Sequence, residues 1–299
     1  MDGDPVIKPM LAISSTKLNQ DCNLNGYIWS GKVDGFRITI QRDHAGIPRA
    51  FTRSMKLHPN RFVQEQFARE DLLGLDGELV CEGDFHKMGG ELRRASGEPD
   101  VIFWAFDCIS SVTFLDRIHR MRHIVTMADH PRVKMLNQYH QVDMDWGKLN
   151  RMNAMMVCQG FEGMCGRLAT SHYREGRSGK VKPELIKVKD FIFSEATIVG
   201  YFPLEHNENP KTINELGQSK RSHHKSGKVV DMTRLGGLVL KHPDFAETFH
   251  AGSGFTHSLQ RQYMSLGDEL LGLTVQFKYQ GIGSTKDRPR SPIFIKLNK

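Results

Sequence analysis

Apolar residues alternate with polar ones over residues 36–41, a pattern typical of half-buried β-strands. Phe36, Ile38 and Ile40 are the apolar members of this pattern. The predicted strands of the first third of the chain are residues 27–41, 47–53, 75–81 and 101–109. They are short, rich in β-branched and aromatic residues, and separated by Gly and Pro, so we expect antiparallel sheets rather than a helical bundle.

Three segments instead repeat their apolar residues every three or four positions, which indicates amphipathic helices. The first is residues 60–70. The second carries the apolar stripe Leu115, Ile118, Met121 and Val125. The third carries Leu149, Met152 and Met156, and Gly160 is placed to end it. These stripes predict core contacts rather than ligand contacts.

The last third again predicts short strands, at residues 191–202, 228–240, 272–279 and 292–297. Many short strands with Gly-rich turns favour a small β-barrel. Residues 234–240 (Arg-Leu-Gly-Gly-Leu-Val-Leu) lack the Lys-Ser/Thr of a phosphate-binding P-loop, so a hairpin turn is the stronger interpretation. We therefore expect an α+β protein with two domains, residues 1–190 and 191–299.

Composition restricts the class of protein. Hydrophobic residues make up 39% and charged residues 25% of the 299 residues, an ordinary globular balance. The net charge of +7 favours a polyanionic partner. Residues 191–299 carry a net charge of +4, and the other 190 residues carry +3. The shorter C-terminal part is therefore more basic per residue.

The cysteines and the apolar runs bear on location. The number of cysteines, five, is odd, and no two form a Cys-x-x-Cys pair, which argues against a zinc site or a disulfide framework and favours a reducing cytosol. No apolar run is long enough to span a bilayer, and charged residues interrupt the start where a signal peptide would lie. We expect a cytoplasmic protein, in the host cytoplasm if the source is viral.

The strongest candidate for chemistry is Lys-Val-Asp-Gly-Phe-Arg at residues 32–37. A free lysine is almost wholly ammonium at neutral pH, and it becomes nucleophilic when it is desolvated or placed beside other cations. Lys32 follows an apolar run, and Arg37 would supply a fixed fork for phosphate or ribose. A surface Lys-Asp pair at a hairpin, with Gly35 making the turn, explains this hexapeptide alone about equally well.

The hexapeptide matches the Lys-x-Asp-Gly-x-Arg signature of the covalent nucleotidyltransferases. Five later segments resemble the other motifs of that superfamily and occur in its order: 51–53, 75–80, 103–107, 161–164 and 186–189. Five degenerate motifs in order are far more specific than any one alone. Nearly the whole chain resembles the minimal ATP-dependent DNA ligases of bacteriophages and bacteria.

The resemblance implies roles for individual residues. Lys32 would be the nucleophile, Glu78 would accept the ribose hydroxyls, and Phe106 would stack on adenine, although core packing would explain Phe106 alone. Glu162 would hold Mg²⁺. The remaining candidates would contact phosphate or base: Ser30 at the adenine-contacting place, Arg37 and Arg53 on phosphates, Lys187 and Lys189 on the α-phosphate, and Arg290 and Lys296 on the pyrophosphate.

Two further expectations concern charge. Lys187 and Lys189, together with Arg37, would lower the pKa of Lys32 by like-charge repulsion. The basic segments 173–180 and 218–228 would grip DNA, although a solvated loop explains each of them nearly as well.

The chain departs from the family at four positions. Lys296 stands where arginine is usual, Ser54 where Asn is frequent, and Arg167 where many relatives have Lys. Ser30 occupies a place where many relatives have a polar or acidic group. None of these removes a residue that the chemistry requires, but Lys296 cannot offer the planar fork of arginine.

The implied protein is an ATP-grasp-like adenylyltransferase domain followed by an OB-fold barrel. It would act as a monomer with ATP and Mg²⁺ and seal nicks in duplex DNA. An RNA ligase and an mRNA capping guanylyltransferase are the enzymatic alternatives, since both share the lysine motif. A basic DNA-binding module with a degenerate nucleotide site is the non-enzymatic alternative.

Overall fold

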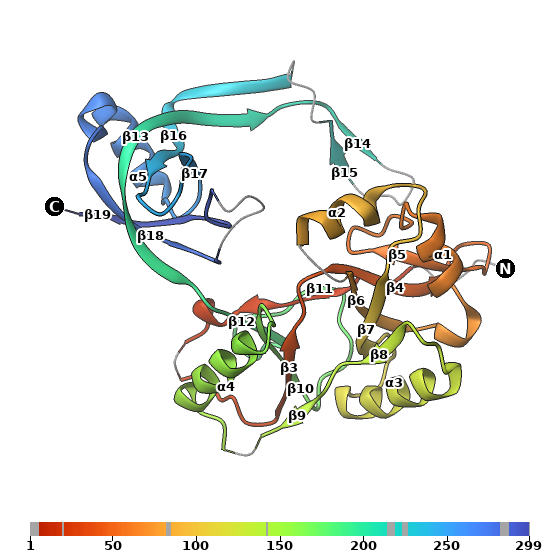
Figure 1. Ribbon diagram of the computed structural model, residues 1–299. Coiled ribbons are helices and arrows are strands. Elements are labelled where there is room, and N and C mark those ends of the chain that lie inside the picture. The colour runs from red at the N-terminus through yellow and green to blue at the C-terminus, as the bar shows by residue number, and fades with distance from the viewer. Residues whose placement is uncertain are drawn as a thin grey trace. The chain divides into compact units, whose positions relative to one another are not determined.

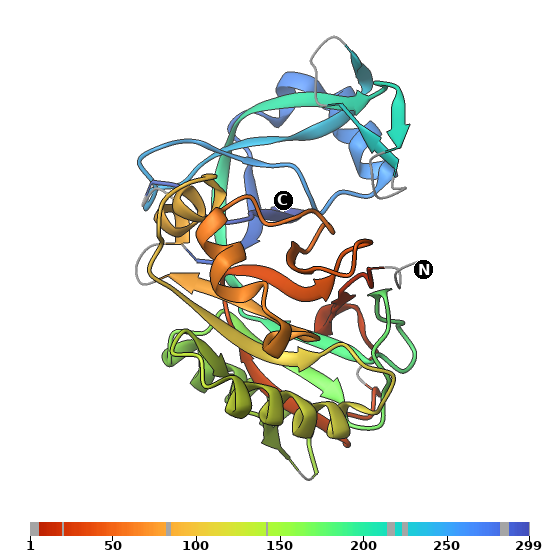
Figure 2. The ribbon, with the colours of Figure 1, turned by 90° about the vertical axis from the view of Figure 1, so that its right-hand side faces the viewer.

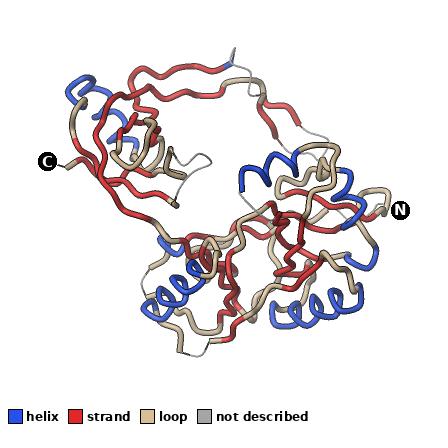
Figure 3. The backbone as a smooth tube through the Cα atoms, viewed as in Figure 1, coloured by secondary structure: helices blue, strands red, loops and turns tan. Residues whose placement is uncertain are grey.

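The computed structural model describes residues 6–19, 21–81, 85–141, 143–213, 219–222, 227–281 and 287–298. It divides into two compact units, Met1–Asp190 and Phe191–Lys299. Both units contain more strand than helix (Figure 3), so the α+β class expected from the sequence is confirmed. No helix of the described part is long and apolar enough to cross a membrane.

The first unit contains two five-stranded sheets. One has the order β5-β4-β6-β7-β8, and we call it the arginine sheet. Its strands are β4 (Phe36–Arg42), β5 (Pro48–Thr52), β6 (Leu75–Cys81), β7 (Val101–Cys108) and β8 (Val133–Met135). Its apolar core includes Ile38, Leu79 and Phe103, which are fully buried. Helix α3 (Phe114–Ala128) packs against β7 and β8, while α1 (Arg61–Phe67) packs against β5 (Figures 1 and 2).

The second sheet has the order β2-β12-β10-β3-β9, and we call it the lysine sheet. Its strands are β2 (Ile13–Ser14), β3 (Tyr27–Lys32), β9 (Tyr139–His140), β10 (Gly163–Leu168) and β12 (Leu185–Lys189). Helix α4 (Trp146–Cys158) lies beside it and packs on β10 (Figure 1). Its core contains Trp29, Leu149 and Met164.

Smaller elements complete this unit. Strand β1 (Met10–Leu11) pairs in parallel with β11 (Gly176–Arg177), which brings the start of the chain beside the segment that follows β10. Helix α2 (Phe85–Arg93) contacts β6. Two 3₁₀ turns are η1 (Ser15–Lys17) and η2 (Glu70–Leu72).

The second unit is built on a five-stranded sheet of order β17-β16-β13-β18-β19. Its strands are β13 (Ile192–Asn207), β16 (Lys228–Lys241), β17 (Phe249–Ala251), β18 (Thr274–Tyr279) and β19 (Ile293–Leu297). Helix α5 (His257–Leu266) packs on β16, η4 (Gly267–Leu270) follows it, and β14 (Lys211–Ile213) pairs with β15 (Ser219–Arg221). Aromatic residues fill the core, where the rings of Phe255 and Phe294 stack with centroids 4.5 Å apart.

Most predicted elements are present, and two details are wrong. Residues 234–240 form no turn but lie inside β16. A Cβ at Gly236 would lie 2.4 Å from the carbonyl oxygen of Pro203 on β13, where the pairing register shifts. The two glycines therefore permit a close backbone approach at an irregularity in the sheet. Leu115 is 42% exposed, because Phe114 takes the buried place on α3.

Candidate active site

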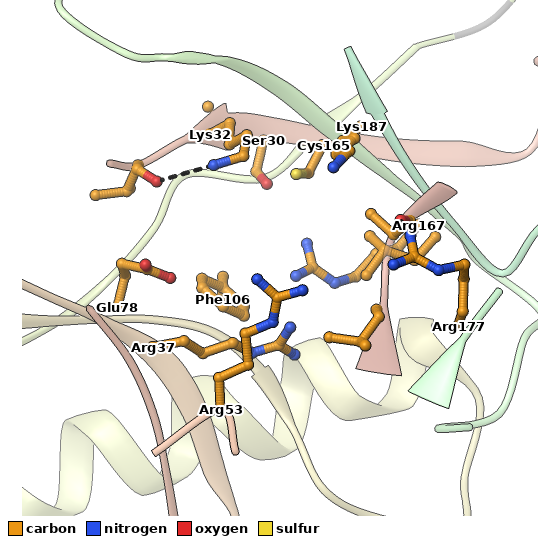
Figure 4. A pocket seen from close by; sticks show the side chains of 15 residues that line it. Ser30, Lys32, Arg37, Arg53, Glu78, Phe106, Cys165, Arg167, Arg177 and Lys187 are labelled. Carbon is orange, nitrogen blue, oxygen red and sulfur yellow. Dashed lines mark hydrogen bonds between the residues drawn. The ribbon is translucent and has the colours of Figure 1, made fainter. Parts of the chain in front are cut away.

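A pocket with a cavity volume of about 160 Å³ opens between the two sheets of the first unit. Figure 4 shows side chains from both sheets pointing into it. The labelled lining residues are Ser30, Lys32, Arg37, Arg53, Glu78, Phe106, Cys165, Arg167, Arg177 and Lys187.

The candidate nucleophile Lys32 is the last residue of β3. Its ammonium group forms an ion pair with Glu162, and the backbone N–H of Glu162 donates a 2.8 Å hydrogen bond to the Lys32 carbonyl. The turn after Lys32 needs glycine, because a Cβ at Gly35 would lie 2.3 Å from the Leu79 carbonyl oxygen. Gly35 thus permits close packing of the turn on β6.

The lysine sheet places its polar residues in rows by strand register. Lys32 and Lys189 lie opposite Gly163 from either side, and Glu162 bonds both ammonium groups. In the next row, Ser30 and Lys187 lie opposite Cys165. Lys187 and Lys189 lie on the same face of β12, as predicted.

The pKa of Lys32 is raised, so the expected lowering is wrong. Burial lowers this pKa, but electrostatic interactions with Cys165, Glu162 and Glu78, together with the hydrogen bond to Glu162, outweigh burial. Lys187 behaves in the opposite way: burial, followed by repulsion from Lys189 and Lys32, lowers its pKa. The Glu162 carboxylate determines the difference, because it bonds Lys32 directly.

Arg37 is bonded to protein partners, and its contact with phosphate or ribose stays a prediction. Its Nε and Nη2 donate to Asp76 at 2.8 and 2.6 Å, and Nη1 donates to the carbonyl of Met10 at 2.6 Å. The Tyr173 hydroxyl donates to the same Asp76 at 2.7 Å. Because Asp76 is fully buried, its charge needs these partners. Arg37 therefore shapes the pocket wall.

Phe106 lies between two guanidinium groups. The carbon Cζ of Arg37 is 5.3 Å and that of Arg167 is 4.7 Å from the ring centroid, both within cation–π distance. Arg167 is 3% exposed, and its Nε lies 3.2 Å from Asp107 in an ion pair without hydrogen-bond geometry. Asp107 also holds the fully buried Arg117 by two hydrogen bonds. Stacking of Phe106 on adenine stays a prediction.

Glu78 and Arg53 complete the wall formed by the arginine sheet. Burial raises the pKa of Glu78 to about 7, against the opposing charges of Lys32 and Arg37. Arg53 is exposed, lines the pocket and has no partner among the described residues. The guanidinium of Arg53 can therefore bind an anion without breaking a contact within the protein.

Several pocket residues were not predicted as site residues. Cys165 carried no motif signal, Arg177 lies in the predicted basic segment 173–180, and Arg167 was noticed only as a departure from the family. Tyr173 lies in the predicted basic loop, but it is a structural residue bonded to Asp76. A polar residue within an apolar strand motif, as in Leu75–Val80, was the available signal for the buried Asp76.

The remaining predicted residues lie elsewhere. Arg290 exchanges backbone hydrogen bonds with Gln280 and Gly281, and the exposed Lys296 pairs with Gln276 in the sheet, all in the second unit. Their assignment to pyrophosphate stays a prediction. Much of segment 218–228 lies outside the described residues.

Glu162 is the predicted ligand of Mg²⁺. The described residues contain no group of three or more His, Cys, Asp or Glu arranged to hold a metal. Mg²⁺ in nucleotide sites commonly takes only one or two carboxylates, together with phosphates and water. The single carboxylate of Glu162, at the edge of a cationic pocket, fits that mode of binding.

Comparisons with known proteins agree with this architecture. Residues 226–297 match the family model of the DNA ligase OB-like domain. A structure of Lig E DNA ligases matches with a TM-score of 0.70 and 21% identity, covering 98% of this chain and 100% of that one. The Chlorella virus DNA ligase-adenylate matches with a TM-score of 0.54 and 22% identity, covering 98% and 100%.

A third structure, Pmar-Lig_PreS3, has a TM-score of 0.74 and 19% identity, covering 98% of this chain and 68% of that one. A search of curated proteins finds no match. At these identities the likeness establishes the fold. The chain has the α+β fold of these DNA ligase structures, and its second unit contains the residues that match the OB-like domain.

Proposed function

We propose that this chain is an ATP-dependent DNA ligase that seals 5′-phosphate/3′-hydroxyl nicks in duplex DNA. The observation that carries the proposal is the position of Lys32, at a strand end in a cationic pocket and bonded to the one carboxylate that bridges it to Lys189. The ligase fold over 98% of the chain supports it. The RNA ligase and capping alternatives have no comparable support.

The first step would attach AMP to the protein. Lys32 is protonated in the free chain, so a proton must leave Nζ before attack, and Glu162 Oε2 is its hydrogen-bond partner. Nζ then forms a bond to the α-phosphorus of ATP while the bond to pyrophosphate breaks. Lys187 and Arg53 line the pocket and would bind the phosphates, which would position the reactants and neutralise charge.

The next two steps would use the stored AMP. The 5′-phosphate at the nick attacks the adenylyl phosphorus and releases Lys32. The 3′-hydroxyl then attacks the activated phosphate, AMP leaves, and the strand is joined. A Mg²⁺ ion held by Glu162 with phosphate oxygens and water would neutralise phosphate charge.

Nick sealing tests the proposal. A duplex with a 5′-phosphorylated nick is incubated with ATP and Mg²⁺ and analysed on a denaturing gel. The unmodified chain should seal it, and Lys32→Ala and Lys32→Arg should not, since arginine keeps the charge but cannot be deprotonated. Lys17→Ala, an exposed lysine outside the pocket, is the matched control and should remain active. Sealing by Lys32→Arg would contradict the proposal.

A further inference from the structure

The five cysteines differ in their surroundings, and none forms a disulfide. Burial raises the pKa of Cys81 to about 11 and that of Cys108 to about 12, and it also raises the pKa of Cys22. Thiols of this kind react slowly, because the thiolate is the nucleophile. Cys158 is exposed at the end of α4, and Cys165 is partly exposed in the pocket wall.

Cys165 has two cationic neighbours. It lies directly across the sheet from Lys187, and Lys32 is close enough for negative charge on the Cys165 sulfur to raise the pKa of that lysine. Figure 4 shows the sulfur and the Lys187 nitrogen on the same side of the pocket. A partly exposed thiol in an electropositive setting is the typical environment of a reactive cysteine.

A second observation points to a ligand position in this part of the pocket. Ser30 lies across the sheet from Cys165, is 1% exposed, and its Oγ has no hydrogen-bond partner among the described residues. Figure 4 shows that oxygen pointing into the pocket. A buried hydroxyl is normally paired, so a polar ligand atom is the expected partner. The Cys165 side chain therefore borders the ligand's position.

We propose that Cys165 is a site of reversible oxidation by small peroxides, and that the oxidised side chain excludes nucleotide from the pocket. This inference rests on the proposed function, since it takes the ligand to be ATP. The Cys165 thiolate attacks one peroxide oxygen, an S–O bond forms, the O–O bond breaks and hydroxide leaves. The sulfur is oxidised by two electrons to a sulfenic acid, and the peroxide is reduced.

The reverse reaction needs a thiol reductant. One reductant thiol displaces water from the sulfenic acid and forms a mixed disulfide, and a second thiol releases Cys165. The added oxygen atom would lie between Cys165 and its two cationic neighbours. There it competes with nucleotide phosphate for the ammonium groups of Lys32 and Lys187, which explains the expected loss of binding.

The test treats the full chain with hydrogen peroxide, traps sulfenic acid with dimedone and maps the label by peptide mass spectrometry. Cys165 should carry the label, and prior incubation with ATP and Mg²⁺ should reduce it roughly tenfold. Transfer of AMP to the protein should fall by a similar factor after oxidation and return with dithiothreitol.

Two variants separate the site from general damage. Cys165→Ser, compared with its own untreated activity, should be resistant to peroxide, whereas Cys158→Ser should be as sensitive as the parent chain. Equal inactivation of Cys165→Ser, or a label on Cys158 alone, would overturn the proposal. Since the label is read on the parent chain, this result stands even if a variant does not fold.

The failures of the two proposals can be distinguished. If Cys165 is labelled but ATP gives no protection, the nucleotide pocket assignment is contradicted, and nucleotide exclusion by oxidation is overturned with it. If AMP transfer proceeds but Cys165 stays unlabelled, only the oxidation proposal is overturned.

Discussion

The two walls of the pocket use positive charge in opposite ways. On the lysine sheet, Lys32 is 21% exposed in its side chain and shares one carboxylate with Lys189. On the arginine sheet, Arg37 forms an ion pair with Asp76, and their side chains are 13% and 0% exposed. Lys32 can exchange its protein partner for a ligand, whereas Arg37 cannot do so without leaving the buried carboxylate of Asp76 unpaired.

The comparison indicates a division of labour. Lysine is a flexible point charge whose proton affinity follows its surroundings, which suits chemistry. Arginine is planar and always charged, and its fork holds a carboxylate in a fixed geometry, which suits a rigid wall. Removing an arginine-sheet carboxylate should therefore mainly affect stability, and removing the lysine-sheet carboxylate should mainly affect activity.

Asp76→Ala should give the largest effect. It leaves the buried Arg37 unpaired and removes the partner of Tyr173, so the free energy of unfolding should fall by about 3–5 kcal/mol. Urea unfolding measures this change. The matched control is Asp71→Ala, which breaks the exposed pair with Arg69 and should cost at most about 1 kcal/mol. Equal losses would contradict the rigid-wall account.

Glu162→Gln should damage chemistry more than stability. Without the carboxylate, Lys32 and Lys189 both lose their ion-pair partner, so AMP transfer to the protein should fall on the order of 10²-fold. Single-turnover AMP transfer measures this. Glu65→Gln, an exposed position on α1, should be neutral. A large loss of stability in Glu162→Gln with unchanged AMP transfer would reverse the assignment.

Glu78→Gln should change the pH dependence of stability. The pKa of Glu78 is raised from 4.5 to about 7, so the folded chain binds this proton more tightly than the unfolded chain. Glu78 therefore makes the free energy of unfolding fall as the pH rises from about 4.5 to about 7. In Glu78→Gln that contribution, about 3 kcal/mol, should disappear. Identical pH profiles for the two chains would contradict the assigned burial.

Tyr173→Phe should have the smallest effect. It removes the 2.7 Å hydrogen bond to Asp76 but leaves both bonds from Arg37, so the loss of stability should be about 1 kcal/mol. The KM for ATP in AMP transfer should rise modestly, because Arg37 lines the pocket. A loss as large as that of Asp76→Ala would show that Tyr173, and not the ion pair, holds this wall.

Local sequence patterns predicted much of the fold. Local motifs predicted many of the residues that line the pocket. Alternation located β4, β6 and β7, and the apolar stripe located α4 with its end at Gly160, which has a positive φ of 90°. The sequence also placed Lys187 and Lys189 on one face. These features depend on residues close together in the chain, which periodicity can detect.

The errors came from long-range contacts. The pairing of Arg37 with Asp76, 39 residues away, was not predicted, and the raised pKa of Lys32 depends in part on Glu162, 130 residues away. Gly236 looked like a turn, but its partner Pro203 is on another strand. The pattern of residues along one strand does not show which charged side chains of other strands lie beside it.

The most direct test of the central claim is the mass of the intact protein after incubation with ATP and Mg²⁺, followed by peptide mapping. The account predicts one added adenylyl group, acid-labile and attached to Lys32 Nζ, and none on Lys32→Arg. An unmodified protein, or an adenylyl group on any other residue, would contradict it.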